Sequence, residues 1–204
     1  MVAGTNGAGK SSIAGAALAR HGATCYDPDR ATRRYVRAGL ALEEANARAW
    51  QRGRAQLERS LAEGTHYAFE TTLGGRTITR LLIQAGERGH RIRVWYVGLA
   101  SPELHLRRVR ARVAGGGHEI PERTIRARWT SSRQNLVRLL PHLSELVLYD
   151  NSYEAAPAEG RAPRPLRILH ARSGEIVHLL APEQIPAWCR PVVAAAVQRW
   201  GGDS

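Results

Sequence analysis

The sequence predicts a three-layer α/β fold with a mostly parallel central sheet, and two observations carry this prediction. Short apolar stretches alternate along the chain with longer stretches of helical periodicity, which is typical of parallel sheets covered by helices. The stretch 92–99 (IRVWYVGL) is almost continuously apolar, as a strand buried on both faces should be. Polar clusters also follow several expected strands, at the sheet edge where such folds bind ligands.

The segment 4–11 (GTNGAGKS) has the spacing G-x-x-x-x-G-K-[ST] and predicts a P-loop. Glycines allow backbone N–H groups to turn inward around phosphate oxygens, and a helix beginning at Lys10 adds its positive dipole end. Lys10 is expected to reach the β- and γ-phosphates, and Ser11 to bind Mg²⁺. The alternative is a glycine-rich turn before the helical stretch 13–22. The nucleotide-binding candidates are Gly4, Thr5, Asn6, Gly7, Ala8, Gly9, Lys10, Ser11 and Ser12.

Strands and helices are expected in alternation after the P-loop. A P-loop normally follows a full buried strand, and only residues 1–3 precede this one, so we expect a clipped first strand. A longer helix after residue 40 carries apolar or small residues at helical spacing, Leu42, Ala45, Ala49, Trp50, Gly53, Leu57 and Leu61. The expected strands are 22–29, 66–73, 92–99 and 145–152. The expected later helices are 76–89, 101–113 (opened by Ser101 and Pro102) and 121–140.

The C-terminal quarter is expected to be structural. Residues 154–166 form a Pro/Ala-rich connection, 166–180 predict a hairpin turning at Ser173–Gly174, and 182–200 predict a helix interrupted by prolines. We expect a P-loop core over residues 1–152, with a lid at about 105–128. Residues 153–204 are expected to pack on the same domain as an extension.

Composition narrows the class of protein. The 204 residues are 43% hydrophobic and 24% charged, which is ordinary for one globular domain. No apolar run reaches the roughly 18 to 20 residues of a membrane span. Two cysteines, Cys25 and Cys189, form neither a disulfide framework nor a metal site. We therefore expect a cytoplasmic protein with no secretory signal and no membrane partner.

The net charge of +12 suggests nucleic-acid binding, but the distribution of the charge does not favour it. The arginines are spread along helices, and there is no zinc finger, RRM signature or aromatic platform. Lys10 is the only lysine, so the compact ammonium charge occurs only in the P-loop and the other positively charged side chains are arginines. The same count excludes the N/T-K-x-D motif of GTPases. An arginine-rich surface with a phosphate-binding cleft is the simpler interpretation.

Acidic and hydroxyl side chains follow the second and third expected strands. Asp29, in YDPD, is the preferred general base for a substrate hydroxyl; Asp27 is the alternative, or a helix cap. Glu70, Thr71 and Thr72, in FETTL, form a hydrogen-bonding set suited to a polyol or sugar, although they could simply be a solvated strand edge. A general base together with such a hydrogen-bonding set predicts phosphoryl transfer to a small molecule.

The segment 105–128 is rich in arginine and is interrupted by glycines. Arg108 and Arg112 share a helix face, and Arg126 and Arg128 follow the glycine hinge. Arginines can stabilise the charge on a transferred phosphoryl group, and a hinge would let them close as a lid. His118 could contact phosphate or substrate, or only fix the loop. The alternative for the segment is a solvated arginine-covered helix.

Taken in order, these motifs resemble the zeta toxin family, in its short bacterial branch of P-loop kinases. The segments that carry the resemblance are AGTNGAGKSS, DPD, FETTL, RVRARVAGGGHEIPE and LYDNS, over roughly residues 3–152. The resemblance implies a kinase that uses ATP or GTP with Mg²⁺ to phosphorylate UDP-N-acetylglucosamine, and a possible antitoxin partner.

Carried over by motif, the resemblance assigns Lys10 and Ser11 to the nucleotide and Asp29 to catalysis as the base. Arg112 and Arg126 are the nearest matches to the catalytic phosphate-binding arginines, and Glu70 and Thr72 match the sugar contacts. The remaining substrate-binding candidates are Thr71, Arg108, His118 and Arg128. The alternatives are a kinase of another hydroxylated metabolite or antibiotic, and a nucleotide-dependent nucleic-acid-binding protein.

Overall fold

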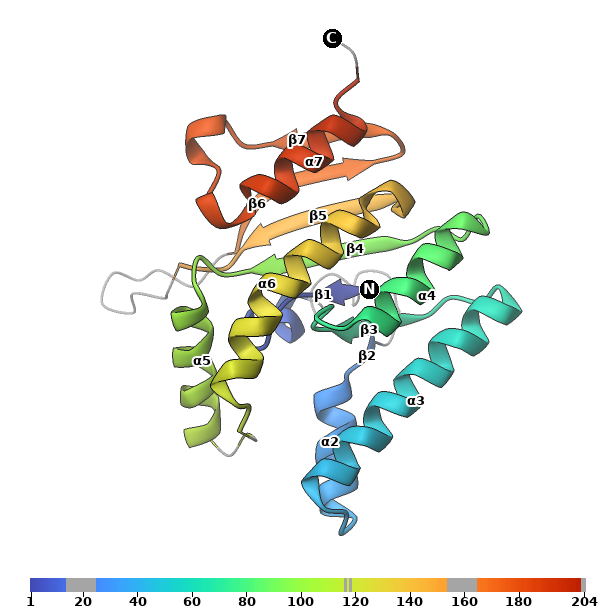
Figure 1. Cartoon of the computed structure of the whole chain (residues 1–204), viewed down its shortest axis with the longest axis vertical. Coiled ribbons are helices and arrows are strands. Elements are labelled where there is room, and N and C mark those ends of the chain that lie inside the picture. The colour runs from blue at the N-terminus through green and yellow to red at the C-terminus, as the bar shows by residue number, and fades with distance from the viewer. Residues whose placement is uncertain (14–24, 116, 118, 154–164, 203–204) are drawn as a thin grey trace.

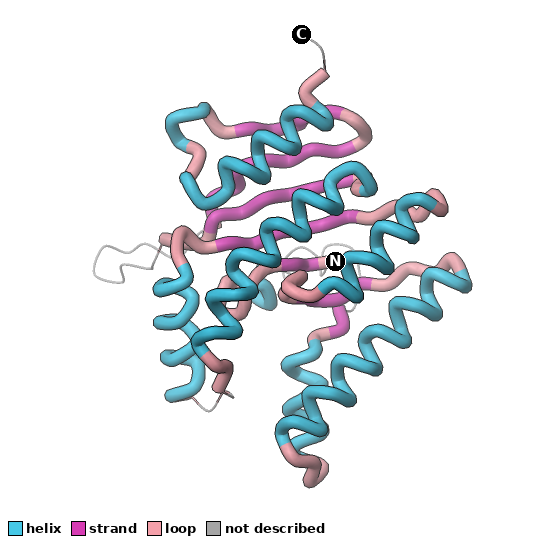
Figure 2. Tube along the Cα trace, in the orientation of Figure 1, coloured by secondary structure: helices cyan, strands magenta, loops and turns pink. Residues whose placement is uncertain are grey.

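The computed structural model describes residues 1–13, 25–115, 117, 119–153 and 165–202. Within these residues, one sheet of seven strands has the order β2-β3-β1-β4-β5-β6-β7 (Figures 1 and 2). The strands are β1 (Val2–Ala3), β2 (Cys25–Tyr26), β3 (Ala68–Thr71), β4 (Arg93–Gly98), β5 (Glu145–Asp150), β6 (Leu166–Arg172) and β7 (Glu175–Leu179). The α-helices are α2 (Pro28–Arg37), α3 (Leu42–Glu63), α4 (Arg76–Glu87), α5 (Pro102–Ala114), α6 (Glu122–Leu139) and α7 (Arg190–Trp200).

The first five strands are parallel to one another, whereas β6 runs antiparallel to β5 and β7 runs antiparallel to β6. β1 lies between β3 and β4, with Val2 opposite Glu70 and Trp95. β5 pairs with β6 in antiparallel register, and β6 pairs with β7 through the turn at Ser173 and Gly174, both of which have positive φ. The prediction of a mostly parallel sheet and that of a hairpin at this turn are therefore confirmed.

Successive side chains of the strands point to opposite faces of the sheet, and those on each face pack against helices. This packing gives the three layers. Val94 and Tyr96 of β4 join the main core with α4, α6 and α7, which lie on the near face in Figure 1. Val97 of β4 packs instead with Val2 and Ala8, on the opposite face. Because successive residues of a strand point to opposite faces, an apolar run such as β4 must be covered on both sides.

The expected helices are present, with shorter bounds in several places. α3 buries Ala45, Ala49 and Leu57, as its spacing predicts, whereas Trp50 is half exposed. Ser101 caps α5 by accepting a hydrogen bond from the Leu104 N–H at 3.2 Å. Of the predicted strand 22–29, residues 22–24 lie outside the described residues, Cys25–Tyr26 form β2, and the strand ends early because α2 begins at Pro28. The helical prediction for 13–22 and most of the connection 154–166 lie outside the described residues.

The C-terminal elements share the core of the earlier ones. Ile168 and Leu169 of β6 and Val192 of α7 belong to the same apolar cluster as β4 and β5. Two short 3₁₀ turns, Pro182–Gln184 and Ala187–Cys189, replace the first part of the predicted helix 182–200, because the prolines interrupt it. Among the described residues, no helix is both long enough and apolar enough to cross a membrane.

We predict that Gly98→Ala destabilises the fold. Gly98 ends β4 beneath the ring of Trp188, and a Cβ there would overlap the ring. Overpacking of this kind costs about 1–3 kcal/mol, measurable by urea unfolding. Gly75→Ala is the matched control, because a Cβ at Gly75 has no neighbour within 4 Å. Equal unfolding midpoints for the two variants would contradict the packing argument.

Candidate active site

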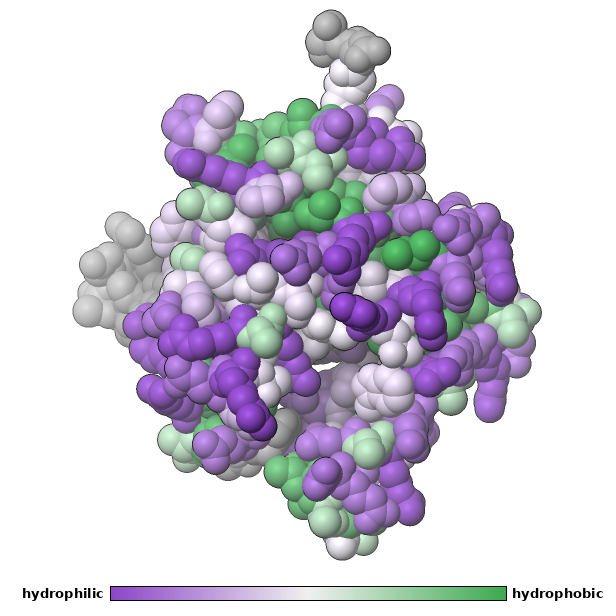
Figure 3. Space-filling model, in the orientation of Figure 1, coloured by the Kyte–Doolittle hydropathy of each residue, from purple (hydrophilic) through white to green (hydrophobic). Residues whose placement is uncertain are grey.

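A cavity of about 1060 Å³ opens at the carboxyl ends of the parallel strands. The P-loop forms its floor, α2 and α3 form one wall, and α5 and α6 form the other. Figure 3 shows the surface hollowed between these two helical pairs. The volume lies at the upper end of the range for small-molecule sites, which leaves space for two ligands side by side.

The P-loop backbone adopts conformations that require glycine at three positions. Gly4, Gly7 and Gly9 have φ of 142°, 81° and 88°. A Cβ at Gly4 would also overlap the carbonyl oxygen of Val97, where the loop crosses β4. Residues 10–13 are helical, so the loop ends at a helix N-terminus. This is the arrangement that binds phosphate through backbone N–H groups.

Lys10, Ser11 and Glu70 meet where the P-loop faces the end of β3. The Ser11 hydroxyl donates to Glu70 Oε2 at 3.2 Å, and Glu70 is buried. Burial lowers the pKa of Lys10, while the Glu70 carboxylate acts in the opposite direction. Burial also raises the pKa of Glu70, against the opposing effect of Lys10. The carboxylate predicted to contact the acceptor thus lies on the phosphate side of the cavity.

The chemistry of this oxygen pair fits a magnesium ion. Mg²⁺ prefers oxygen ligands and is typically held by one or two carboxylates together with substrate phosphates and water. Ser11 and Glu70 offer a hydroxyl and a carboxylate oxygen in contact, beside the P-loop. Among the described residues, no cluster of three or more His, Cys, Asp or Glu forms a site from protein ligands alone. A shared site of protein and phosphate oxygens is therefore the arrangement that the residues can support.

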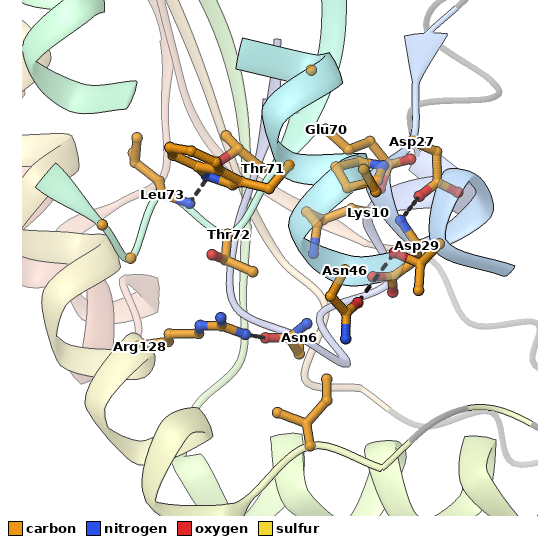
Figure 4. A pocket seen from close by; sticks show the side chains of 18 of the residues that line it. Asn6, Lys10, Asp27, Asp29, Asn46, Glu70, Thr71, Thr72, Leu73 and Arg128 are labelled. Carbon is orange, nitrogen blue, oxygen red and sulfur yellow. Dashed lines mark hydrogen bonds between the residues drawn. The ribbon is translucent and has the colours of Figure 1, made fainter. Parts of the chain in front are cut away.

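The two aspartates of YDPD have different positions. Asp27 caps α2, because its Oδ1 accepts the N–H groups of Asp29 (2.8 Å) and Arg30 (3.2 Å). Asp29 makes no such cap and lines the cavity near Lys10 (Figure 4). Both aspartates line the cavity, but only Asp29 has a carboxylate that is not engaged in capping α2.

Arg112 joins helix α5 to Asp29. Its Nη1 donates to Asp29 Oδ2 at 2.9 Å, in an ion pair that is about one third exposed. Its Nε and Nη2 are buried and have no hydrogen-bond partner among the described residues. Buried donors normally have partners, so two unsatisfied guanidinium nitrogens beside a P-loop fit an anion such as phosphate.

The other arginines of the predicted lid segment divide between the cavity and the surface. Arg128 lines the cavity and donates to Asn6 Oδ1 at 2.9 Å (Figure 4). Arg108 also lines it, and donates to the carbonyl oxygen of Asn151 at 2.8 Å. Arg126 lies outside, where it pairs with Glu103 (2.7 Å) and Glu122 (2.8 Å).

The position of Arg126 differs from its expected catalytic role, and helix geometry gives the reason. Residues two apart on a helix point about 200° apart, so Arg126 and Arg128 cannot face the same cavity. The structure places Arg128 there. His118 lies outside the described residues.

The remaining wall of the cavity combines hydroxyl groups with aromatic rings. Thr71 and Thr72 both line the cavity, and the hydroxyl of Thr71 also accepts the Leu73 N–H at 3.0 Å in a local turn. Leu73 has a φ of 53°, which is rare for a non-glycine residue and often marks a functional loop. Tyr26, Trp50 and Phe69 also line this part. Such a wall suits a ligand that has both hydroxyl groups and an apolar face.

Several polar residues near the site are not predicted by the sequence. Asn46 accepts the Thr32 hydroxyl at 3.1 Å and lines the cavity (Figure 4). Asn151 donates to the Ala8 carbonyl oxygen at 2.8 Å, and its only sequence signal is its place in LYDNS after a strand. His105 is 1% exposed, and its Nδ1 donates to the Asn6 carbonyl oxygen at 2.8 Å. Inside a helix of arginines, His105 carries no recognisable signal.

Comparison with known proteins agrees with this geometry. A family model described as an AAA domain matches residues 1–136, more than half of the chain. An uncharacterised protein of Haemophilus influenzae is 35% identical over 63 residues, which cover 31% of this chain and 45% of that protein. The chain therefore spans less than half the length of this relative.

Two solved structures have a similar fold. AvrRxo1-ORF1:-ORF2 with ATP aligns over 96% of this chain and 62% of that chain, with a TM-score of 0.64 and 16% identity. A chain of the PezAT chromosomal toxin–antitoxin system of Streptococcus pneumoniae aligns over 100% of this chain and 78% of that chain, with a TM-score of 0.50 and 13% identity. At these identities the likeness shows the three-layer fold alone.

We predict a pH-dependent stability term from His105. Burial lowers the pKa of His105 from 6.5 to about 4, because the charged ring is disfavoured inside the fold. The neutral ring therefore stabilises the fold fully above pH 6.5, and this stability is lost as the pH falls toward 4. The loss amounts to about 2 kcal/mol by pH 5.

The measurement is urea unfolding of the wild type and His105→Asn between pH 7.5 and 5. Asparagine can donate to the same carbonyl oxygen but does not titrate, so the difference between the two proteins should shrink as the pH falls. Parallel curves over this range would contradict the assignment of a buried neutral imidazole.

Proposed function

The chain belongs to the AAA domain family matched above, and on this premise we propose that it is a P-loop kinase. It would transfer the terminal phosphoryl group of ATP or GTP to a hydroxyl group of a small molecule. The observation that carries the proposal is the placement of Asp29 in the P-loop cavity, joined to Arg112 and without a capping role. A P-loop that only bound nucleotide would not need a carboxylate free of structural capping in the same cavity.

The donor side is supported by the positive groups around the P-loop. The N–H groups at the glycines, the Lys10 ammonium and the free donors of Arg112 suit the oxygens of a triphosphate. A magnesium ion held by Ser11 and Glu70 would neutralise charge that develops on the phosphate oxygens. Arg108 and Arg128 line the same cavity and add to the positive field.

The acceptor side is supported by Asp29 and by the wall beside it. The acceptor hydroxyl oxygen would form a bond to the terminal phosphorus, while its proton passes to the Asp29 carboxylate. The bond from that phosphorus to the leaving nucleoside diphosphate breaks in the same step. General-base assistance of this kind contributes about 10²- to 10⁴-fold in rate.

For the acceptor we propose a sugar nucleotide, with UDP-N-acetylglucosamine first among them. The resemblance to zeta toxins implies this compound, and the mixed wall of Thr72, Tyr26, Trp50 and Phe69 is compatible with a sugar and a planar base. The likeness in fold to a PezAT chain supports the same family assignment. It also supports an antitoxin as the protein partner, since that system pairs a toxin with an antitoxin.

We predict that Asp29→Asn greatly slows phosphoryl transfer and retains nucleotide binding. The assay is mass spectrometry of the protein mixed with Mg²⁺, ATP or GTP, and UDP-N-acetylglucosamine, followed by a panel of other sugars, nucleosides and aminoglycosides. The wild type should yield an acceptor one phosphate heavier. Asp29→Asn should be slower by about 10²- to 10⁴-fold, because the amide cannot accept the proton.

Two variants control this experiment. Lys10→Ala removes the phosphate contact and should abolish transfer together with nucleotide binding. Asp27→Asn makes the same chemical change two residues away, and asparagine caps helices as well as aspartate does, so it should behave as the wild type. Near-normal transfer by Asp29→Asn would overturn the assignment of the base, and no phosphorylated product across the panel would overturn the kinase proposal.

A further inference from the structure

Two side chains hold the P-loop from its outer side. His105, in the first turns of α5, donates to the Asn6 carbonyl oxygen at 2.8 Å. Asn151, directly after β5, donates to the Ala8 carbonyl oxygen at 2.8 Å. A carbonyl oxygen can only accept, so the imidazole must carry its proton on Nδ1. Both contacts bind the backbone of the loop and leave the P-loop side chains untouched.

The planarity of the peptide bond gives these contacts a consequence for phosphate binding. In a trans peptide the C=O group and the following N–H group point in opposite directions, and no cis peptide occurs in the described chain. When His105 holds the Asn6 C=O, the N–H of Gly7 is directed to the opposite side. When Asn151 holds the Ala8 C=O, the N–H of Gly9 is directed in the same way. Gly7 and Gly9 both line the cavity.

The fit around the two glycines shows how closely these supports approach. A Cβ at Gly9 would lie 2.5 Å from Asn151 Nδ2. A Cβ at Gly7 would lie 2.9 Å from the carbonyl oxygen of His105. Glycine is therefore needed at both positions for a second reason besides its positive φ. The P-loop, His105 and Asn151 are therefore packed closely together.

Asn151 and the residue after it are fixed by contacts with β4, with α5 and with the segment that follows β4. Its N–H donates to the Gly98 carbonyl oxygen at 3.0 Å, at the end of β4. Its carbonyl oxygen accepts from Arg108 Nη2 at 2.8 Å, on α5. The next residue, Ser152, accepts the Ala100 N–H at 2.7 Å and donates its hydroxyl to the buried Asp150. The loop after β5 thus ties the P-loop to β4 and to helix α5.

We propose that His105 and Asn151 are positioning residues that orient the N–H groups of Gly7 and Gly9 for a triphosphate. They do so before any ligand arrives, so binding does not require the loop to reorganise. Neither side chain touches the phosphate; each acts through the peptide group whose carbonyl it holds. The proposal rests on phosphate binding by the P-loop and is independent of the acceptor.

The test measures binding of inorganic tripolyphosphate and of a non-hydrolysable ATP analogue by calorimetry. Tripolyphosphate contacts the phosphate cradle alone, so it isolates the effect on the N–H groups. Asn151→Ala and His105→Leu should each weaken both ligands by about tenfold, since each loses one orienting hydrogen bond. Asn151→Asp should weaken them further, because a carboxylate oxygen would face the Ala8 carbonyl oxygen.

A conservative variant and a distant control separate positioning from general stability. His105→Asn can donate to the same carbonyl oxygen and should restore binding to near the wild-type affinity. His170→Leu removes a hydrogen bond of similar length, from His170 Nε2 to Glu145 at 2.9 Å, far along the sheet on β6. It should lower the melting temperature without changing affinity for either ligand. His105→Leu is the variant most at risk of misfolding, and the two Asn151 variants then decide the question.

The outcomes are distinct from those of the kinase assay. Wild-type affinity for tripolyphosphate in folded Asn151→Ala and Asn151→Asp would overturn the positioning role, whatever their melting temperatures. Weaker binding in these variants with normal binding in His170→Leu would establish it. A wild type that binds tripolyphosphate but transfers nothing would overturn the proposed function and leave this inference standing.

Discussion

The positive charge of Lys10 in a desolvated cradle is the constraint on which the rest of the site depends. Burial lowers the pKa of this ammonium group, and only the neighbouring carboxylates, Glu70 first among them, oppose that effect. Arg112 adds a second cation, two of whose nitrogens have no partner among the described residues. The P-loop, the strand ends and helix α5 therefore converge on a place where a phosphate group would be stabilised. The anionic phosphate oxygens would pair with the Lys10 ammonium group and with the two nitrogens of Arg112 that have no partner among the described residues.

The backbone geometry behind this site follows from local sequence, which is why much of it could be predicted. Glycines at Gly4, Gly7 and Gly9 are needed for positive φ, and the spacing of a P-loop records that need directly. The apolar run of β4 predicts burial on both faces, and parallel strands bring their carboxyl ends to one edge. The motif residues from Gly4 to Ser12, Asp29 and Glu70 therefore meet in space because the topology places their strand ends together.

What could not be predicted depends on contacts between distant parts of the chain. His105 and Asn6 are 99 residues apart, and Asn151 and Ala8 are 143 residues apart. No local pattern in the sequence records such pairs. The distinction between Arg126 and Arg128 depends on which face of α6 turns toward the P-loop, and charge spacing alone does not fix that rotation. Asp27 could be separated from Asp29 only once the start of α2 was known.

The most direct test of the central claim is a crystal structure of the protein with Mg²⁺ and a non-hydrolysable ATP analogue. The account predicts phosphate oxygens within hydrogen-bond distance of Lys10 Nζ, the free nitrogens of Arg112 and the N–H groups of Gly7 and Gly9. It also predicts the Asp29 carboxylate on the far side of the terminal phosphorus from the leaving oxygen, as in-line transfer requires. A triphosphate bound elsewhere, or one whose terminal phosphorus is shielded from Asp29, would contradict the account.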